Sequence, residues 1–261
     1  MQTVAPKKHL GQHFLKDKNI ASQITDCVSK HKGYTQLLEI GAGTGVLTEI
    51  LQARKDISLS LVEIDTESVK YLKEVLKFPA EKIIEGDILK LNLAQIFEEQ
   101  AIGIIGNLPY NISSQIFFKV LEHKNQVMEV VCMIQKEVAE RIAAKHGNKT
   151  YGILSVLLQA YYNIEYQFTV HEHVFNPPPK VKSAVITLRR NEVEKLPCNE
   201  KLFANIVKTG FNQRRKTLRN ALKPIGIPVE IAENKIFDKR AEQLSVQDFI
   251  LLTQLMEKNK Q

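Results

Sequence analysis

Short apolar runs alternate with segments of helical periodicity over residues 35–134, and this alternation constrains the fold more than any other feature. The first run is ended by Gly41 and the fifth is rich in β-forming residues, and we predict strands at 35–40, 58–65, 82–87, 101–107 and 127–134. Between several of them, apolar residues recur every three to four positions, which predicts helices at 46–53, 66–77 and 112–122. Strands joined through helices form parallel crossovers covered on both faces. The sequence therefore predicts an α/β fold with a mostly parallel sheet.

The pattern continues to residue 190 and then changes. Residues 136–145 have helical periodicity, and residues 161–170 and 183–189 alternate as expected for a pair of strands that complete a seven-strand sheet. Residues 191–199 read as a linker, and only helical periods follow it. We therefore predict a Rossmann-like domain over residues 1–190 and a small all-helical domain over residues 191–261.

Composition narrows the class of protein. Hydrophobic residues make up 44% of the chain, which is enough for a packed core. No stretch reaches the roughly 18 uncharged apolar residues of a membrane helix, and the first residues lack the apolar core of a signal peptide. Three cysteines lie far apart at 27, 132 and 198, which favours free thiols over a metal site or a disulfide framework. We expect a cytoplasmic protein without a membrane or metal partner, and a monomer.

Three successive strand ends carry residues typical of a nucleotide site. Gly41 and Gly43 follow the first strand and open a helix, Glu63 ends the second strand, and Asp87 ends the third. Glycines allow a close approach of the backbone to a ligand, and an acid about 20 residues later suits ribose hydroxyls. Asp87 is placed to meet an adenine amino group. Because no phosphate-binding lysine follows the turn, we predict an adenosine ligand that need not carry a pyrophosphate. The expected contacts are Gly41, Gly43, Glu63, Ile64, Asp87 and Ile88.

The fourth strand ends in Asn107-Leu108-Pro109-Tyr110, which resembles the [N/D]-x-P-[F/Y] motif of S-adenosylmethionine-dependent methyltransferases that act on exocyclic amines. The lone pair of an adenine N6 is delocalised into the ring. Acceptors on Asn107 and Leu108 that face its N–H bonds would favour a pyramidal nitrogen, whose lone pair can attack a methyl group. Pro109 stiffens the loop, and Tyr110 offers a face for an unstacked base. Methyl transfer is then helped by positioning and electrostatics.

A second aromatic residue precedes a run of three prolines. Phe175 lies just before Pro177, Pro178 and Pro179, which favour a stiff, extended segment. We expect Phe175 to stack on the other face of the target base and count it with the catalytic residues.

Several further segments, in order, resemble the ribosomal RNA adenine dimethylases. They begin with an N-terminal signature and end with a basic motif, at residues 8–15, 107–113, 135–144, 175–185 and 211–222. This resemblance implies a class I methyltransferase fold and S-adenosylmethionine as cofactor. It also implies a signature segment that helps cover the cofactor, and it places Asn107 among the residues that contact the cofactor. His13, where asparagine is commoner in the family, and Leu15 are implicated in that cover.

The basic motif at residues 211–220 resembles the bacterial small-subunit enzymes of this family and their eukaryotic and mitochondrial relatives. The implied reaction is dimethylation of N6 on two adjacent adenosines near the 3′ end of 16S rRNA, in the small ribosomal subunit, with a role in subunit biogenesis. A large-subunit (23S) dimethylase and a mainly non-catalytic assembly factor are the alternatives.

The distribution of charge supports a phosphate-rich partner. The formal net charge of the chain is +7, and residues 201–223 alone hold seven Lys and Arg and no acid. Residues 1–18 and 171–190 form two smaller basic clusters. Clustered cations are the electrostatic footprint of nucleic-acid binding. We expect RNA contacts from Arg214, Arg215, Lys216, Arg219 and Lys180.

Overall fold

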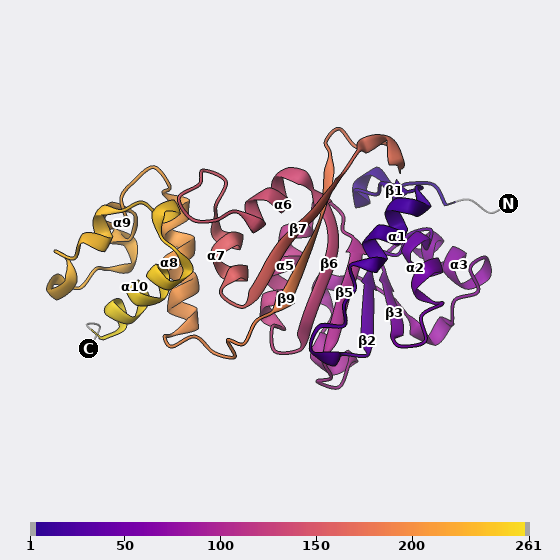
Figure 1. The fold of residues 1–261 in the computed structure, drawn as a ribbon, viewed down its shortest axis with the longest axis horizontal. Helices are drawn as coiled ribbons and strands as arrows, with labels where there is room; N and C mark the ends of the chain where they lie inside the picture. The colour runs from indigo at the N-terminus through magenta and orange to yellow at the C-terminus, as the bar shows by residue number, and fades with distance from the viewer. Residues whose placement is uncertain (1–3, 259–261) are drawn as a thin grey trace. The chain divides into compact units, whose positions relative to one another are not determined.

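The computed structural model describes residues 4–258, and these form two compact units. One unit consists of the described parts of Met1–Ala139 and Asn163–Arg190, and the other of those of Glu140–Tyr162 and Asn191–Gln261. Figure 1 follows the chain through both units. The second unit includes residues 140–162, which were predicted to belong to the first domain.

A seven-stranded sheet, counted over the described residues, organises the first unit in the order β4-β3-β2-β5-β6-β9-β7. Strands β2 to β6 pair in parallel, and β9 pairs antiparallel with β6. The predicted α/β class and the mostly parallel sheet are confirmed. The strands are Gln36–Ile40 (β2), Ser58–Glu63 (β3), Ile83–Glu85 (β4), Ile102–Asn107 (β5), Val127–Gln135 (β6), Tyr162–Val170 (β7) and Ser183–Arg190 (β9).

The central strands are buried, as expected where both faces of a parallel sheet are covered. In β5 every residue except Asn107 is buried, and its glycines allow close packing. A Cβ atom on Gly103 would lie 2.2 Å from the Tyr34 ring, and one on Gly106 would lie 2.5 Å from the Ile40 carbonyl oxygen. These contacts explain why a buried strand contains two glycines.

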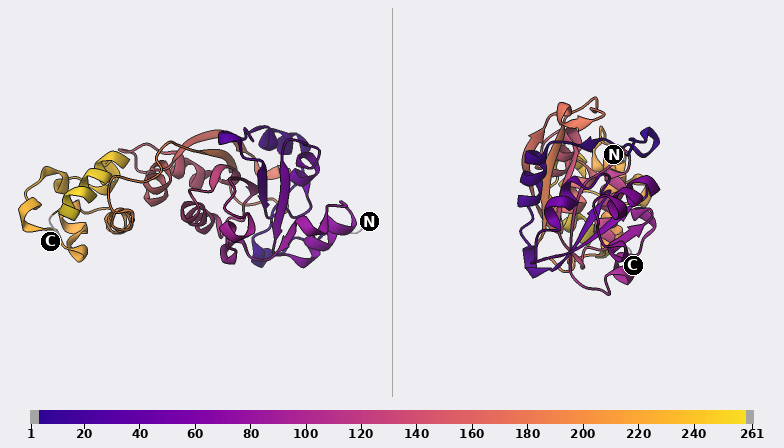
Figure 2. Two further views of the ribbon diagram at one scale, coloured as in Figure 1. Left: turned by 90° about the horizontal axis from the view of Figure 1, so that it is seen from below. Right: turned by 90° about the vertical axis from the view of Figure 1, so that its right-hand side faces the viewer.

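Helices pack around this sheet (Figure 2). Their N-termini are fixed by side-chain caps where Asp or Asn precedes the helix; Asp17 accepts hydrogen bonds from two backbone N–H groups of α1, for example. Helix α1 was not predicted, although this cap could have located its start. The helices are Lys18–Asp26 (α1), Val46–Leu51 (α2), Thr66–Glu74 (α3), Leu93–Ile96 (α4), Ser113–Glu122 (α5) and Lys136–Ala143 (α6), which continues into the second unit.

A second, two-stranded sheet joins distant parts of the first unit. Phe14–Leu15 (β1) pairs antiparallel with Phe175–Asn176 (β8), with Leu15 opposite Phe175. Both of these side chains are buried in the core cluster. The pairing fixes the N-terminal segment beside the loop that precedes β9.

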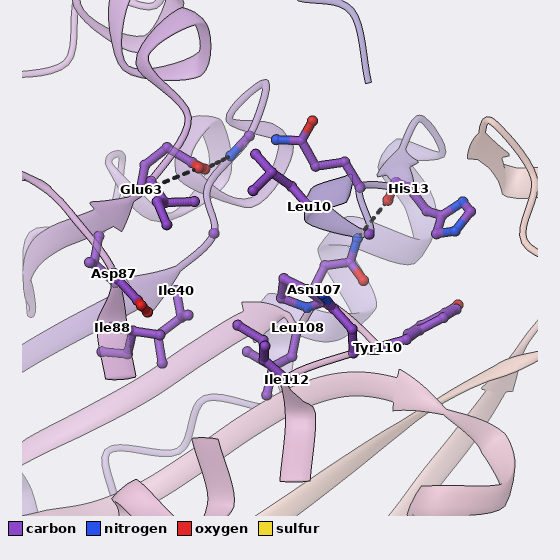
Figure 3. Close-up of a pocket in the computed structure, with 18 of the residues that line it drawn as sticks. Leu10, His13, Ile40, Glu63, Asp87, Ile88, Asn107, Leu108, Tyr110 and Ile112 are labelled. Atoms are coloured by element: carbon purple, nitrogen blue, oxygen red, sulfur yellow. Dashed lines mark hydrogen bonds between the residues drawn. The ribbon is translucent and has the colours of Figure 1, made fainter. Parts of the chain in front are cut away.

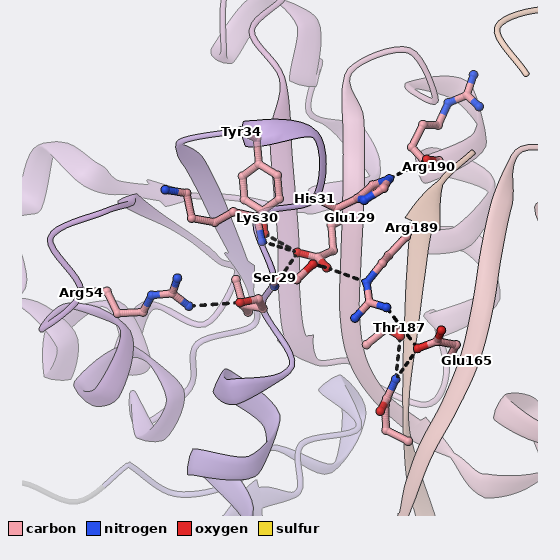
Figure 4. A network of polar contacts seen from close by, with 12 residues as sticks. Ser29, Lys30, His31, Tyr34, Arg54, Glu129, Glu165, Thr187, Arg189 and Arg190 are labelled. Carbon is pink, nitrogen blue, oxygen red and sulfur yellow. Dashed lines mark hydrogen bonds and ion pairs between the residues drawn. The ribbon is translucent and has the colours of Figure 1, made fainter. Parts of the chain in front are cut away.

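A buried carboxylate stabilises the end of the sheet at which the parallel strands begin. The fully buried side chain of Glu129, near the start of β6, accepts hydrogen bonds from the backbone of Ser29 and Lys30 and from the Tyr34 hydroxyl (Figure 4). Arg189 supplies a positive charge at 3.3 Å. Burial and this carboxylate raise the pKa of Tyr34, so it remains a donor. The network satisfies the buried charge and ties the segment that follows α1 to β6 and β9.

The second unit is built from helices around aromatic side chains. Phe211 stacks on Phe249 with ring centroids 6.0 Å apart, and it meets Tyr151 edge-on at the same distance. Short 3₁₀ turns connect the last two helices. The helices here are Ile153–Gln159 (α7), Glu200–Asn212 (α8), Leu218–Ala221 (α9) and Val246–Lys258 (α10). None of the described helices combines the length and apolar character that a membrane crossing requires.

Candidate active site

A cavity opens at the carboxyl ends of the parallel strands, where ligands bind in sheets of this kind. It contains about 960 Å³ of empty space, part of it open to solvent. Its walls come from the ends of β2, β3, β4 and β5 and from residues 9–14 (Figure 3). The predicted residues Gly41, Gly43, His13, Glu63, Ile64, Asp87, Ile88 and Asn107–Tyr110 all line it.

The glycine-rich turn forms the floor of one side. Gly41, Gly43 and Gly45 all have positive φ angles, of 71°, 54° and 77°. L-residues with a side chain rarely adopt such angles, which explains the glycines. A Cβ atom on Gly43 would also lie 2.8 Å from the Phe14 ring. The turn therefore presents bare backbone to the cavity, and Phe14 packs on it.

Glu63 is a buried carboxylate that faces the same side. It is 4% exposed, and it accepts hydrogen bonds of 2.8–2.9 Å from the backbone N–H groups of Gly43, Ile64 and Asp65. Burial raises the pKa of Glu63, and these backbone donors oppose the increase. The oxygen that accepts from Gly43 retains a lone pair for a further donor, such as a ribose hydroxyl.

Apolar and polar groups alternate along the next part of this wall. Ile64 is 49% exposed although it is apolar, and its side chain lines the cavity. Asp87 accepts a hydrogen bond of 3.0 Å from the backbone N–H of Leu89 and so caps the turn that follows β4. Ile88, in that turn, is 5% exposed. This wall can hold a flat heterocycle against isoleucine with a carboxylate at its edge.

On the opposite wall, one hydrogen bond fixes the Asn107 side chain. Its Nδ2 donates to the backbone carbonyl oxygen of His13 at 2.9 Å. Because a carbonyl only accepts, this bond defines which end of the amide is the nitrogen. The Asn107 oxygen therefore points away from His13, as Figure 3 shows, and remains an acceptor.

Tyr110 lies beside Asn107 and is held at both ends. Its hydroxyl is 2.6 Å from the Ser183 hydroxyl, and its ring stacks on the His13 imidazole with centroids 5.5 Å apart. His13 in turn donates from Nδ1 to the Pro177 carbonyl oxygen at 2.7 Å. Burial raises the pKa of Tyr110, so the phenol remains protonated. The ring forms a rigid aromatic surface on this wall.

Residues 7–15, called the N-terminal strap below, cross the mouth of the cavity. Lys7 Nζ lies 2.5 Å from an Asp65 oxygen, and Gln12 Nε2 donates to the other oxygen at 3.2 Å. Burial alone would raise the pKa of Asp65, but the hydrogen bonds from Lys7, Gln12 and Ser68 lower it below its usual range. Lys7, Gln12 and Asp65 were not among the predicted site residues. Asp65 precedes α3 as a cap, which was the one local signal available.

Comparison with known proteins identifies the family. The family model described as ribosomal RNA adenine dimethylase matches residues 4–258. The chain belongs to this family. Proteins named ribosomal RNA small subunit methyltransferase A from Cytophaga hutchinsonii and Flavobacterium johnsoniae are each 57% identical to it, over 98% of this chain and 99% and 98% of their own lengths.

Solved structures agree on the fold. A dimethyladenosine transferase from Plasmodium falciparum has a TM-score of 0.79 and 27% identity, and the match covers 95% of this chain and 98% of that one. The 23S rRNA methyltransferase ErmE has a TM-score of 0.68 at 23% identity over 92% of this chain and 99% of its own, which shows a shared fold. The predicted class I methyltransferase fold is confirmed, and S-adenosylmethionine is the methyl donor of the family.

The cavity of this adenine dimethylase fits that donor. The positive-φ glycines leave a bare cradle at the turn, Glu63 offers carboxylate oxygens, and Ile64 exposes an apolar face. An adenosine needs this combination of apolar contact and acceptors. Within residues 4–258, no group of three or more His, Cys, Asp or Glu side chains is arranged to hold a metal ion.

Two predicted site residues lie elsewhere. Phe175 is 1% exposed and Leu15 is 3% exposed; they pair with each other in the small sheet and pack in the core. Neither is among the residues that line the cavity. In this conformation Phe175 offers no face to a base, because its strand partner and the core cover it. Lys180 is exposed in the segment that leads to β9.

The basic motif divides into exposed and engaged residues. Arg215 and Lys216 are exposed in the turn between α8 and α9. Arg219, in contrast, pairs with Asp238 at 2.7 Å and donates to the Ala232 carbonyl oxygen, and Arg214 lies 4.0 Å from Glu242. The first pair is available to a partner, whereas the second pair holds together parts of the second unit.

Proposed function

We propose that the chain methylates N6 of two adjacent adenosines near the 3′ end of 16S rRNA, using S-adenosylmethionine and giving N6,N6-dimethyladenosine. The observation that carries the reaction is the Asn107 amide, whose nitrogen is committed to His13 and whose oxygen remains an acceptor. The small-subunit substrate is supported by relatives of 57% identity that are named for it.

The cofactor supplies an electrophilic methyl group on a sulfonium sulfur. Asn107 accepts one N–H of the target amine through its side-chain oxygen, and the Leu108 carbonyl accepts the other. Together they direct the lone pair of N6 toward the methyl group. The product ammonium is acidic and loses its proton without a dedicated base. In the second round the amine has one N–H left, so a single acceptor then orients it.

Other residues bind rather than react. Tyr110 stacks on the target base, which must leave the RNA stack to reach Asn107. Glu63 accepts from the ribose of the cofactor, Ile64 and Ile88 pack on its adenine, and Asp87 accepts from the adenine amino group. Gly41 and Gly43 let the backbone approach, while His13 covers the site from the strap.

The RNA is held mainly through its phosphates. Exposed Arg215 and Lys216 in the second unit and exposed Lys180 in the first provide cations for this purpose. We also propose that the enzyme acts as a monomer in the bacterial cytoplasm, where ribosomes are made, and that it contributes to subunit biogenesis.

A transfer assay tests the function. Labelled S-adenosylmethionine is incubated with small subunits, large subunits and duplex DNA that lack the modifications, and the modified base is identified by mass spectrometry. We expect dimethyladenosine in small-subunit RNA alone. Dimethyladenosine on large-subunit RNA would reject the proposed substrate but retain the chemistry, and tight binding to small subunits without transfer would favour an assembly factor.

A further inference from the structure

The N-terminal strap contacts both walls of the cavity. On the cofactor side, Lys7 and Gln12 bind Asp65, and the Phe14 ring packs on Gly43. On the base side, the strap reaches the residues proposed to orient the amine. The His13 carbonyl accepts from the Asn107 amide, and the His13 ring stacks on one face of the Tyr110 ring.

Asp65 is the point where the strap joins the cofactor wall. Its side chain is fully buried, and it lies two residues after Glu63. Besides the two strap donors, it accepts from the Ser68 hydroxyl at 3.0 Å and from the Glu67 backbone N–H at 3.2 Å. The α3 helix therefore fixes the carboxylate, and the carboxylate in turn fixes the strap.

The strap also has little freedom to move independently of the base wall. Gly11 has a φ of 65°, and a Cβ atom there would lie 2.9 Å from the Asn111 side-chain oxygen. A shift of the strap would therefore displace the His13 carbonyl from Asn107 and change its contact with residue 111. Release of the strap at Asp65 has a direct consequence at the catalytic amide.

We propose that Asp65 is a positioning residue that, through the strap, couples cofactor binding to base binding at Asn107. This inference rests on the proposed function, since it names how the two substrates of that site communicate. A cofactor under the strap restricts it and leaves the His13 carbonyl in place for Asn107. The entropy of ordering the strap is then lost once for two ligands, which gives positive cooperativity without a large structural change. Coupling is reciprocal, so RNA tightens cofactor binding by the same factor.

The coupling factor can be measured without turnover. The affinity for labelled S-adenosylhomocysteine is determined by equilibrium dialysis, with and without saturating unmethylated small subunits. For the native protein we expect about 10-fold tighter binding in the presence of subunits, within the usual range for coupled sites. For Asp65→Asn we expect weaker binding to the free protein and a ratio below about 2.

Asp17→Asn is the matched control. Asp17 is also an aspartate that caps a helix, α1, and its side chain accepts from backbone N–H groups of that helix rather than from Lys7 and Gln12. This variant should change stability little, because Asn caps a helix about as well as Asp, and it should keep a ratio near 10. If Asp65→Asn does not fold, Lys7→Ala replaces it, because the Lys7 side chain is partly exposed and forms ion pairs with Asp65 and Glu67, while its backbone hydrogen bonds are kept in the variant.

Hydrogen exchange adds a second readout. S-adenosylhomocysteine should slow exchange of the strap amides in the native protein and in Asp17→Asn, but much less in Asp65→Asn. A ratio near 1 in the native protein, or an unchanged ratio in Asp65→Asn or Lys7→Ala, would overturn the proposal. The transfer assay separates this failure from a wrong function; if the enzyme accepts large-subunit RNA instead, the same ratio is measured with large subunits.

Discussion

The two walls of the cavity are held in place by different means. The cofactor wall consists of strand ends and turns in which Glu63 and Asp87 accept hydrogen bonds from backbone N–H groups one or two residues further along the chain. The base wall depends on contacts over long separations, such as Asn107 with His13 and Tyr110 with Ser183. Local sequence determines the first wall, whereas the second exists only once the strap and the segment before β9 are folded against it.

Removal of the Asn107 amide should break the base wall alone and give the largest effect. For Asn107→Ala we expect methyl transfer to fall by at least about 10²-fold, as when one preorganised polar group is lost from an active site. Affinity for S-adenosylhomocysteine should change little. Asn107→Asp keeps an acceptor but loses the donor to His13, so its rate should lie between that of the native protein and that of Asn107→Ala. Near-native turnover of the alanine variant would reject the proposed role.

On the side of the cofactor wall, a buried carboxylate in β2 should make the stability of the fold depend on pH. Burial raises the pKa of Glu39, beside the glycine-rich turn, to about 7, and the Thr48 hydroxyl opposes this increase. The pKa of Glu39 is higher in the folded protein than in the unfolded chain. The contribution of Glu39 to the stability of the fold is therefore fully present below about pH 4.5 and is lost as the pH rises through about 7. The unfolding free energy of Glu39→Gln should therefore exceed that of the native protein by an amount that grows with pH, by roughly 2–3 kcal/mol.

Chemical denaturation between pH 4.5 and 8 measures this difference. Glu49→Gln is the control, because Glu49 is exposed and pairs with Lys18 at the surface. Its difference from the native protein should stay nearly constant over the same interval. A constant difference for Glu39→Gln would show that Glu39 ionises normally.

Glu63 tests the cofactor wall by binding. For Glu63→Gln we expect affinity for S-adenosylhomocysteine to fall about 20-fold, because hydrogen bonds to a charged acceptor are replaced by weaker ones. Titration calorimetry gives the affinity, and a thermal scan checks the fold. Glu85→Gln, at the exposed end of β4, should bind normally. Equal loss in both variants would show that a general change of charge, rather than a contact, causes the effect.

The smallest effect should come from the second unit. For the double variant Arg215→Ala with Lys216→Ala, we expect about fivefold weaker subunit binding. The slope of log affinity against log salt concentration should become shallower, by an amount that corresponds to the loss of about two phosphate contacts. Arg219→Ala should chiefly lower stability, because that side chain pairs with Asp238. Filter binding at several salt concentrations distinguishes them. An unchanged salt slope in the double variant would exclude these residues from the RNA interface.

The sequence predicted those parts of the molecule that local pattern controls. The strand ends at Gly41, Glu63, Asp87 and Asn107 line the cavity as expected, because parallel strands bring their carboxyl ends to one edge. Helix α7 was missed because its sequence is almost uniformly apolar and has no polar face to give a period.

Long-range contacts explain the remaining differences. Phe175 was expected at the base and instead packs against Leu15, 160 positions away along the chain. The link from Lys7 to Asp65 and the pairing of Arg219 with Asp238 depend on tertiary structure in the same way. No local pattern shows which charged side chains meet in the folded chain.

The state of the ribosomal RNA in cells tests the central claim most directly. A strain that lacks this gene is complemented with the native gene or with Asn107→Ala, and the bases near the 3′ end of its 16S rRNA are measured by mass spectrometry. The account predicts that two adjacent dimethyladenosines are absent from the deletion strain, return with the native gene and stay absent with the variant. Dimethyladenosine in the deletion strain, or its full return with Asn107→Ala, would contradict it.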